Sequence, residues 1–409
     1  MLDDFGQRIR DIILSEMDLS RELSDEEICD LIGSVVSREA RDRPMTIKDR
    51  AELERTIFNS LRKLDVLQEL VDDRDVTEIM VNGPNDIFYE KAGRIQRFKG
   101  HFSSEEKLED VIQQIVGRHN RVVNQASPIV DTRLSDGSRV NIVLNPISIG
   151  GSAVSIRKFP EHPMSMERLV EIEALSPEVA RLLQILTQAK YNIFISGGTG
   201  SGKTTFLNAL SQYIPDDERI ITIEDSAELQ LLGAKNIVRL ETRNANTDGV
   251  TPITIRDLIR TALRMRPDRI IVGECRGAEA LDMLQAMNTG HDGSLSTGHA
   301  NSTEDMLSRL ETMVLQGADG LPLEAIKQQI ASAVDIIIHL SRLRDKSRKT
   351  MAITEVVGIK NGEIELNPLY EFKEDEASTM DKVSGRLVRT GNPLKNDYKL
   401  KLSGIKTAI

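Results

Sequence analysis

The residues of this sequence that most directly imply chemistry form a glycine-rich loop. It reads Gly197-Gly198-Thr199-Gly200-Ser201-Gly202-Lys203-Thr204, is followed by Thr205, and fits the pattern G-x-x-x-x-G-K-T completely. An apolar run precedes it and a helical pattern follows it, which is the context that this motif requires. Glycines let the backbone curl so that N–H groups point at phosphate oxygens, and the following helix presents its positive end to the same anion. We expect this loop to bind the phosphates of ATP, with Lys203 on the β and γ phosphates and the Thr204 hydroxyl on Mg²⁺.

Acidic residues follow two other apolar runs that are predicted to be strands. Ile220–Ile223 is followed by Glu224 and Asp225, and Ile270–Gly273 is followed by Glu274. Ligands of open α/β sheets lie at the carboxyl ends of strands, so these carboxylates should face the phosphates. Hydrolysis needs one group that orients water and a carboxylate that holds Mg²⁺ through its hydration shell. We therefore interpret Glu224 and Glu274 as catalytic residues, and we expect Glu274 and Thr204 to bind Mg²⁺. One acid of the pair Glu224 and Asp225 can instead brace a loop.

Two of the six histidines lie in a segment of small residues, at positions 291 and 299. A lone histidine is usually structural, but a pair in a Gly/Ser/Thr loop suggests a sensor that contacts phosphate or the catalytic carboxylates. We favour His299 over His291 for this role. A metal site is not expected there, because no cysteine or third histidine lies nearby.

Arginines supplied from outside the phosphate loop often neutralise the transition state in assembled P-loop proteins. Candidates before the prolines at 160 and 163 are Arg133, Arg139 and Arg157. Further candidates lie later in the chain: Arg243, Arg264, Arg266 and Arg276. Most arginines only keep a surface soluble, so no single candidate stands out. Taken together, these arginines fit a site between subunits.

The chain divides into segments with different sequence patterns, and these segments must position the residues described above. Apolar residues at intervals of three and four predict a helical bundle over 1–72, with a third helix from Ile47 to about Val71. Short alternating strands and one helix predict a mixed α/β domain over 73–159. Pro160 and Pro163 indicate a linker, placed over 160–170. Strands and helices then alternate over 171–370, as in a parallel sheet covered by helices, and the polar residues 371–409 are expected to be a peripheral appendage.

Composition excludes several classes of function. The formal charge of -11 argues against a general nucleic-acid binder, since affinity for a phosphate backbone needs surplus Lys and Arg. Cys29 and Cys275 are too few for a structural zinc site and fit a reduced compartment. No signal peptide and no apolar run of membrane-spanning length are seen, so a cytoplasmic protein without a membrane span is expected.

Four ordered motifs together resemble the secretion-superfamily ATPases of type II and type IV systems, and match their Walker A, Asp, Walker B and His boxes. These motifs lie at 197–204, 222–229, 264–274 and 296–301, and the resemblance covers most of residues 76–360. The resemblance is strongest to the CpaF-type motor of tight-adherence (Flp-type) pili. Some family members carry zinc-binding CxxC pairs, and this sequence has none. At Gly273 an ordinary Walker B strand would carry Asp, which points to a subclass.

The resemblance implies an α/β fold in which a RecA-like P-loop domain follows a small PAS-like mixed α/β domain and the helical bundle. It also implies a homo-hexameric ring that binds ATP and Mg²⁺ and meets a platform protein at the inner face of the cytoplasmic membrane. Glu224 and Glu274 would act on water and Mg²⁺. Three functions are compatible with this: a pilus-assembly motor, a type IV traffic ATPase that exports protein or DNA, and a nucleotide-gated scaffold with little hydrolysis.

Overall fold

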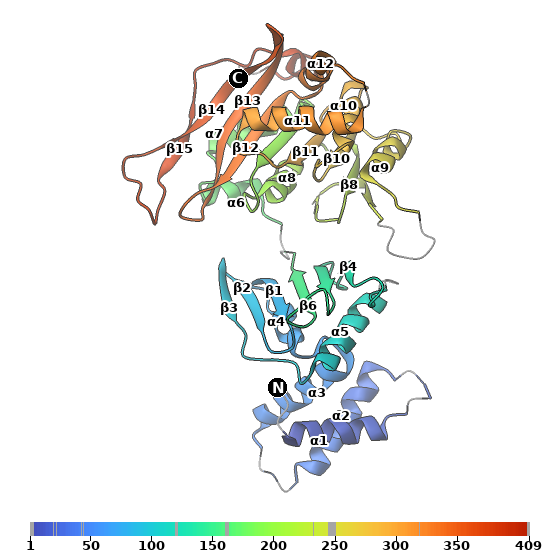
Figure 1. The fold of residues 1–409 in the computed structure, drawn as a ribbon. Helices are drawn as coiled ribbons and strands as arrows, with labels where there is room; N and C mark the ends of the chain where they lie inside the picture. Colours follow the sequence, from blue (N-terminus) through green and yellow to red (C-terminus); the bar gives the residue numbers. More distant parts are fainter. Residues whose placement is uncertain are drawn as a thin grey trace. The chain divides into compact units, whose positions relative to one another are not determined.

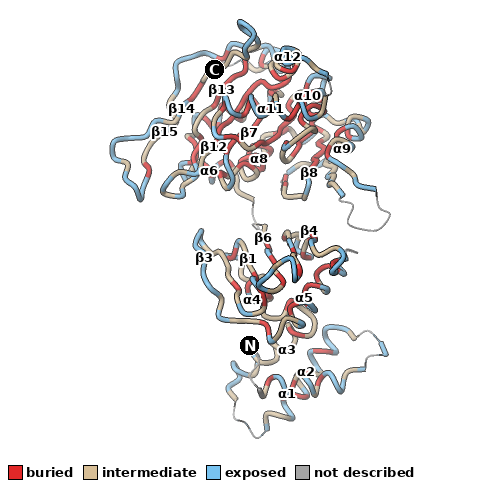
Figure 2. The backbone as a smooth tube through the Cα atoms, in the orientation of Figure 1, coloured by how far each residue is buried: buried red, intermediate tan, exposed pale blue. Residues whose placement is uncertain are grey.

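The computed structural model describes residues 4–18, 20–21, 23–41, 43, 45–118, 122–159, 163–231, 233–243, 251–318 and 320–406. They form two compact units, of which the first ends at Phe159 and the second begins at Pro163 (Figure 1). Each unit has its own buried interior (Figure 2). None of the helices in these ranges is long and apolar enough to cross a membrane.

The first unit begins with three amphipathic helices. They are α1 (Asp4–Glu16), α2 (Asp25–Glu39) and α3 (Ile47–Arg62). Ser24 and Thr46 start the second and third helices with reciprocal capping boxes, which satisfy backbone N–H groups that would otherwise lack partners. The helices bury one common cluster of apolar residues: Ile9, Ile13, Ile28, Ile32, Val35, Val36 and Ile57.

The third helix is shorter than the apolar spacing suggested. It ends at Arg62, and Asp65 adopts a left-handed backbone conformation with φ of 51°. A 3-10 turn, η1 (Asp65–Leu67), and helix α4 (Gln68–Asp72) follow. The leucines beyond the break pack into the core of the α/β domain rather than into the bundle. The predicted boundary at 72 therefore falls about ten residues too late, because periodicity reports burial without saying which core receives the side chain.

The rest of the first unit is an antiparallel sheet with strand order β3-β2-β1-β6-β5-β4. Its strands are β1 (Val76–Asn82), β2 (Ile87–Lys91), β3 (Arg94–Arg97), β4 (Ile129–Arg133), β5 (Arg139–Val143) and β6 (Ala153–Arg157). Helix α5 (Glu105–Gly117) buries its apolar face in the same core. Strand β3 was not predicted, since all four of its residues are exposed and show no apolar alternation.

The second unit is built on one mixed sheet of nine strands, ordered β15-β14-β13-β12-β7-β11-β10-β8-β9. The parallel part comprises β7 (Ile193–Gly197), β8 (Arg219–Glu224), β9 (Asn236–Glu241), β10 (Arg269–Val272), β11 (Leu295–Gly298) and β12 (Ile336–Arg342). The antiparallel extension comprises β13 (Arg348–Lys360), β14 (Glu363–Glu374) and β15 (Gly385–Arg389). The expected parallel sheet is thus only the part before β13.

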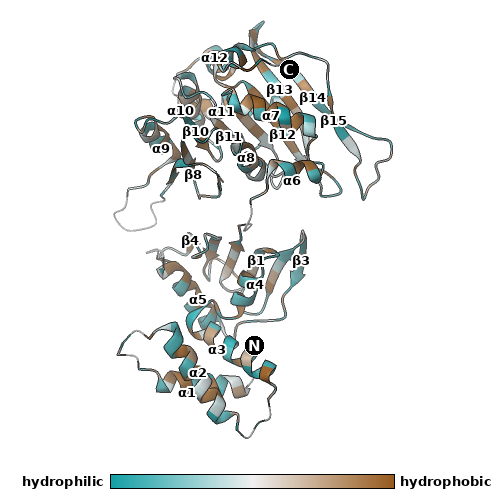
Figure 3. Ribbon diagram, turned by 180° about the vertical axis from the view of Figure 1, so that it is seen from behind, coloured by the Kyte–Doolittle hydropathy of each residue, from teal (hydrophilic) through white to brown (hydrophobic). Residues whose placement is uncertain are grey.

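Helices cover both faces of this sheet. One face packs against α6 (Met166–Glu171), α7 (Pro177–Gln188), α8 (Lys203–Ser211) and α13 (Tyr398–Leu402). The other packs against α9 (Ile255–Ala262), α10 (Glu279–Asn288), α11 (Thr303–Gly317) and α12 (Leu323–Ala333). Along β7, Ile193 and Ile195 join the first core and Phe194 joins the second. A strand with two covered faces can be apolar on both, and the hydropathy colouring shows brown stretches, mixed with paler and teal residues, in the strands between the two helix layers (Figure 3).

Two predicted segments are part of the packed second unit. The expected linker over 160–170 includes the start of α6, which Ser165 caps and which buries Met166 and Leu169. The expected appendage over 371–409 contains the end of β14, all of β15 and the helix α13. Its buried Leu400 belongs to the core of the second unit. Polar composition misled the prediction, because ionic contacts as well as apolar ones hold this segment in place.

One such ionic contact fastens α13. The Lys399 ammonium lies 2.6 Å from the carboxylates of both Asp335 and Asp292. Asp335 is buried, and its carboxylate also accepts the backbone N–H of Asn192. Burial raises the pKa of Asp335 even though Lys399 opposes this effect.

We expect Lys399→Met to lower the free energy of unfolding by about 3 kcal/mol, because it leaves a buried carboxylate without its cation. Lys401→Met is the matched control on the same helix, since its ammonium is exposed and pairs only with the exposed Asp397. It should cost about 0.5 kcal/mol or less. Urea unfolding followed by circular dichroism measures both, and equal losses would contradict the proposed role of Asp335.

Candidate active site

The glycine-rich loop connects the end of β7 to the start of α8. Gly200 and Gly202 have φ angles of 71° and 96°, in the left-handed region that glycine adopts without strain. Gly202 stands directly before the first residue of α8, Lys203. Thr204 and Thr205 are half-buried in the first helical turn. The loop therefore has the strand–loop–helix geometry in which backbone N–H groups and the helix terminus attract an anion.

Lys203 is folded back onto its own loop. Its ammonium donates to the carbonyl oxygens of Gly197 at 3.0 Å and Gly198 at 3.2 Å, and lies 3.3 Å from Nδ1 of His299. Burial lowers the pKa of Lys203, while the Glu274 carboxylate acts in the opposite direction. A buried ammonium with only neutral partners at contact distance is well prepared to exchange them for phosphate oxygens.

His299 joins Lys203 to Glu274. Its Nε2 lies 2.7 Å from Oε1 of Glu274. Burial lowers the pKa of His299, and Lys203, Arg276 and Arg309 lower it further against the effect of Glu274. A neutral ring whose Nε2 carries the proton can accept a hydrogen bond from Lys203 at Nδ1. Oε1 of Glu274 lies close to Nε2 but has no hydrogen-bond partner among the described residues. Arg276 binds the other Glu274 oxygen, with Nη2 at 2.7 Å.

Glu224 is a buried carboxylate at the end of β8. Its Oε1 accepts the backbone N–H groups of Glu228 at 2.8 Å and Leu229 at 2.9 Å. Its Oε2 is buried and has no hydrogen-bond partner among the described residues. Burial raises the pKa of Glu224 to about 7. A carboxylate with this pKa can take a proton from water at neutral pH, which is the property expected of a general base.

Gly273 makes room for Glu224. A Cβ atom at position 273 would lie 2.9 Å from Cγ of Glu224, closer than real Cβ contacts allow. This gives a physical reason why β10 is followed by Gly273 rather than by the aspartate of an ordinary Walker B strand. The carboxylate that an aspartate would supply comes instead from Glu274, one residue later.

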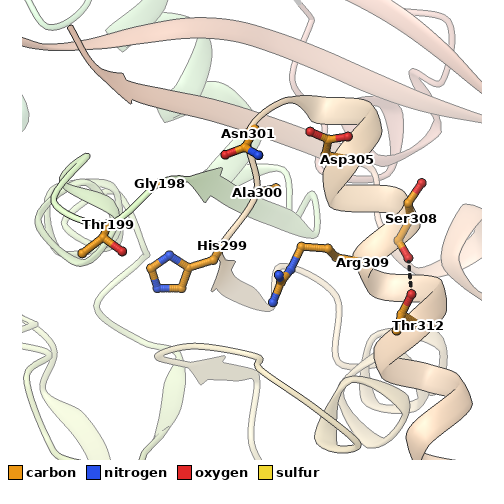
Figure 4. A pocket seen from close by; sticks show the side chains of 9 residues that line it. All are labelled: Gly198, Thr199, His299, Ala300, Asn301, Asp305, Ser308, Arg309 and Thr312. Carbon is orange, nitrogen blue, oxygen red and sulfur yellow. Dashed lines mark hydrogen bonds between the residues drawn. The ribbon is translucent and has the colours of Figure 1, made fainter. Parts of the chain in front are cut away.

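A pocket of about 470 Å³ opens beside the loop (Figure 4). Its wall runs from Gly198 and Thr199 past His299 to α11, which contributes Asp305, Ser308, Arg309 and Thr312. Arg309 extends from that helix toward His299 (Figure 4). Sequence analysis did not single out Arg309; the only signal was its position on the helix that follows the His299 loop.

His339 is a second residue that sequence analysis missed. It is buried on β12, and its Nδ1 lies 2.8 Å from the hydroxyl of Ser196, the residue before the glycine-rich loop. It also makes a hydrogen bond with the backbone of Asn301, two residues after His299. Burial lowers its pKa. His339 therefore connects the start of the phosphate loop to the His299 loop. No local sequence pattern predicts a contact between residues so far apart in the chain.

Some predicted residues lie away from this edge of the sheet. His291 precedes β11, and Arg264 and Arg266 precede β10, so all three are at the amino ends of parallel strands. The glycine-rich loop follows the carboxyl end of β7. The interpretation of His291 as a sensor is therefore wrong for the site within this unit. Arg243 donates to the carbonyl oxygen of Thr251 instead of approaching the loop.

The three arginines of the first unit form a row. Arg133 pairs with Arg139 across β4 and β5, and Arg139 pairs with Arg157 across β5 and β6. Residues directly opposite each other in a sheet share a face, so three positive charges stand side by side. On its other side Arg157 pairs with Glu78 of β1, so the row ends beside a carboxylate.

The loop fits a nucleotide and its magnesium ion. The Ser201 hydroxyl is buried there and has no hydrogen-bond partner in the described structure. The Thr204 hydroxyl and the Glu274 carboxylate are the groups of this chain that would hold Mg²⁺, which retains several waters and also binds the nucleotide. Across the described ranges no cluster of three or more His, Cys, Asp or Glu residues could hold a metal ion by itself.

Comparison with known proteins assigns the chain to a family. A family model described as "Type II/IV secretion system protein" matches residues 60–387. The chain belongs to this family. The conjugal transfer protein TrbB of Rhizobium radiobacter is 31% identical over 334 residues, which cover 80% of this chain and 98% of that protein. The type IV secretion system protein VirB11 of Brucella suis is 33% identical over 303 residues, which cover 68% of this chain and 84% of VirB11.

A solved structure shares the fold of this chain. The structure of the Legionella pneumophila ATPase DotB superposes with a TM-score of 0.53 at 21% identity, covering 73% of this chain and 80% of DotB. This likeness agrees with the α/β class predicted from sequence.

We expect one glutamate carboxyl of the protein to titrate near pH 7 rather than near 4.5, because burial disfavours the charged form of Glu224. Carbon-detected NMR of protein labelled at the glutamate carboxyl carbon measures this midpoint. The signal should disappear in Glu224→Gln and persist in Glu228→Gln, its neighbour in the same loop. Normal titration of every glutamate would contradict the burial of Glu224.

Proposed function

We propose that this member of the type II/IV secretion family hydrolyses ATP with Mg²⁺ and uses the energy to drive assembly of a pilus or a secretion machine. The observation that carries the proposal is the continuous contact from Lys203 through His299 to Glu274, with Glu224 at the end of the neighbouring strand. These are the cation, the sensor and the two carboxylates that hydrolysis of a phosphoanhydride requires.

The residues divide the reaction among them. Lys203 exchanges the carbonyls of Gly197 and Gly198 for β- and γ-phosphate oxygens, and its contact with His299 then reports that a phosphate is present. Glu224 orients a water molecule and accepts its proton as the water oxygen bonds to the γ phosphorus. The bond from that phosphorus to the β–γ bridging oxygen breaks, so ADP and phosphate leave. Mg²⁺, when bound, offsets the charge of the phosphate oxygens.

A ring of identical subunits, a homo-hexamer, completes this proposal. The row of Arg133, Arg139 and Arg157 would supply positive charge to the transition state of a neighbouring subunit. A platform protein at the membrane would receive the mechanical work. In this arrangement the ATPase activity per molecule rises steeply with protein concentration, because an isolated chain lacks part of its site.

We expect Glu274→Gln to reduce ATP turnover by about 100-fold or more while ATP still binds, because the amide cannot replace the charge that faces His299. Lys203→Ala should lose ATP binding as well as turnover. Asp225→Asn is the matched control, because Asp225 is exposed at the end of β8. Its ATP turnover should fall only a few-fold. Steady-state phosphate release and equilibrium binding of a fluorescent ATP analogue separate the two effects. Full turnover in Glu274→Gln would reject this mechanism, whereas ATP binding without turnover in the unmodified chain would favour a nucleotide-gated scaffold.

A conjugation or type IV secretion function is the second candidate, and the similarity to TrbB and VirB11 favours it. The effect of DNA on ATP turnover distinguishes the two possibilities. For a pilus motor we expect double- and single-stranded DNA to leave ATP turnover unchanged, in keeping with the acidic net charge. Stimulation by DNA that weakens as salt concentration increases would instead support DNA export.

A further inference from the structure

A second cavity lies entirely within the first unit, apart from the phosphate loop. It has a volume of about 600 Å³ and lies where α1 and α3 meet the β2–β3 hairpin and the start of α5. This volume is within the range of sites that hold a small organic ligand. Tyr89 and Phe98 form part of the wall, with ring centroids 6.3 Å apart in an edge-to-face arrangement.

The lining of this cavity is rich in cations although the chain as a whole is acidic. Arg10, Arg55, Arg97, Lys99 and Lys107 all contribute to it. Arg97 pairs with Asp86 and Lys107 lies 3.8 Å from Asp65. Within the described ranges, Arg10, Arg55 and Lys99 have no carboxylate within ion-pair distance. The five basic residues outnumber the three acidic residues that also line the cavity, Asp65, Glu69 and Asp72, so an anion placed there would meet net positive charge.

Arg10 adds an observation of a different kind. Its Nε is buried and has no hydrogen-bond partner among the described residues. A buried donor without a partner costs free energy and indicates a missing ligand or water. Asp65, close enough to Arg10 and Lys107 to interact with their charges, is half-buried on the wall of the same cavity at the start of η1.

We propose that this cavity binds a phosphorylated small molecule, such as a nucleotide or a sugar phosphate, through Arg10, Arg55 and Lys99. A phosphate monoester carries up to two negative charges and several acceptors, and arginine matches its geometry with two parallel donors. Asp65 and Glu69 on the same wall would accept hydrogen bonds from the hydroxyl or amino groups of such a ligand. The site is independent of the phosphate loop, and so of the proposed ATPase function.

Isothermal titration calorimetry on the full-length chain with Lys203→Ala tests this inference, because that change disables the other phosphate site. Pyrophosphate and AMP are the probes, at low ionic strength. We expect one site per chain, and we expect Arg10→Gln combined with Arg55→Gln to weaken binding by about tenfold or more. Glu69→Gln should strengthen it, because a negative charge leaves the wall.

Arg94→Gln is the matched control. Arg94 is an exposed cation of β3 that does not line the cavity, so its loss should leave the affinity unchanged. Circular dichroism confirms that each variant folds. Equal affinity in the double variant, an equal loss in Arg94→Gln, or no binding of either probe would overturn the proposal. Binding to vesicles that contain phosphatidic acid without binding of pyrophosphate or AMP would also overturn it, because the ligand would then be a lipid headgroup.

Discussion

The candidate active site depends on one constraint, which is that its strands are parallel and adjacent. Strands β7, β11, β10 and β8 lie side by side, and their register places Ser196 opposite Gly298 and Val272 opposite Ile223. The residues that follow each strand therefore meet at one edge. Segments separated by up to about a hundred residues are brought into hydrogen-bond contact, as Lys203 and His299 are. Without this topology none of the four motifs could act on the same phosphate.

Burial then gives these side chains their chemistry. Desolvation disfavours the charged forms of the Lys203 ammonium and the Glu224 carboxylate. It therefore lowers the pKa of Lys203 and raises the pKa of Glu224. Neutral partners hold the two groups while the phosphate is absent: backbone carbonyls for Lys203 and backbone N–H groups for Glu224. Because these partners carry no net charge, a substrate can replace them at little cost. The same low dielectric strengthens every contact that the substrate makes.

Sequence alone predicts the parts of the site whose chemistry is local. The loop around Lys203 is one continuous motif, Glu224 and Glu274 each follow a recognisable apolar run, and His299 lies in a segment of small residues. His339 and Arg309 were missed because their importance comes from tertiary contacts that leave no local pattern. The same reason explains the errors in the fold. Leu67 has helical spacing but belongs to another core, and the polar segment around Lys399 is held by a buried carboxylate far away in the chain. Periodicity and composition describe each segment without its partner.

The packing of Gly273 against Glu224 has a consequence for how this site can change. Any side chain at position 273 would occupy space that the Glu224 methylene groups already fill. The two positions are therefore epistatic. An aspartate at 273 would require the Glu224 side chain to move or to be replaced by a smaller one. Substitution at this strand end is therefore expected to involve both positions together.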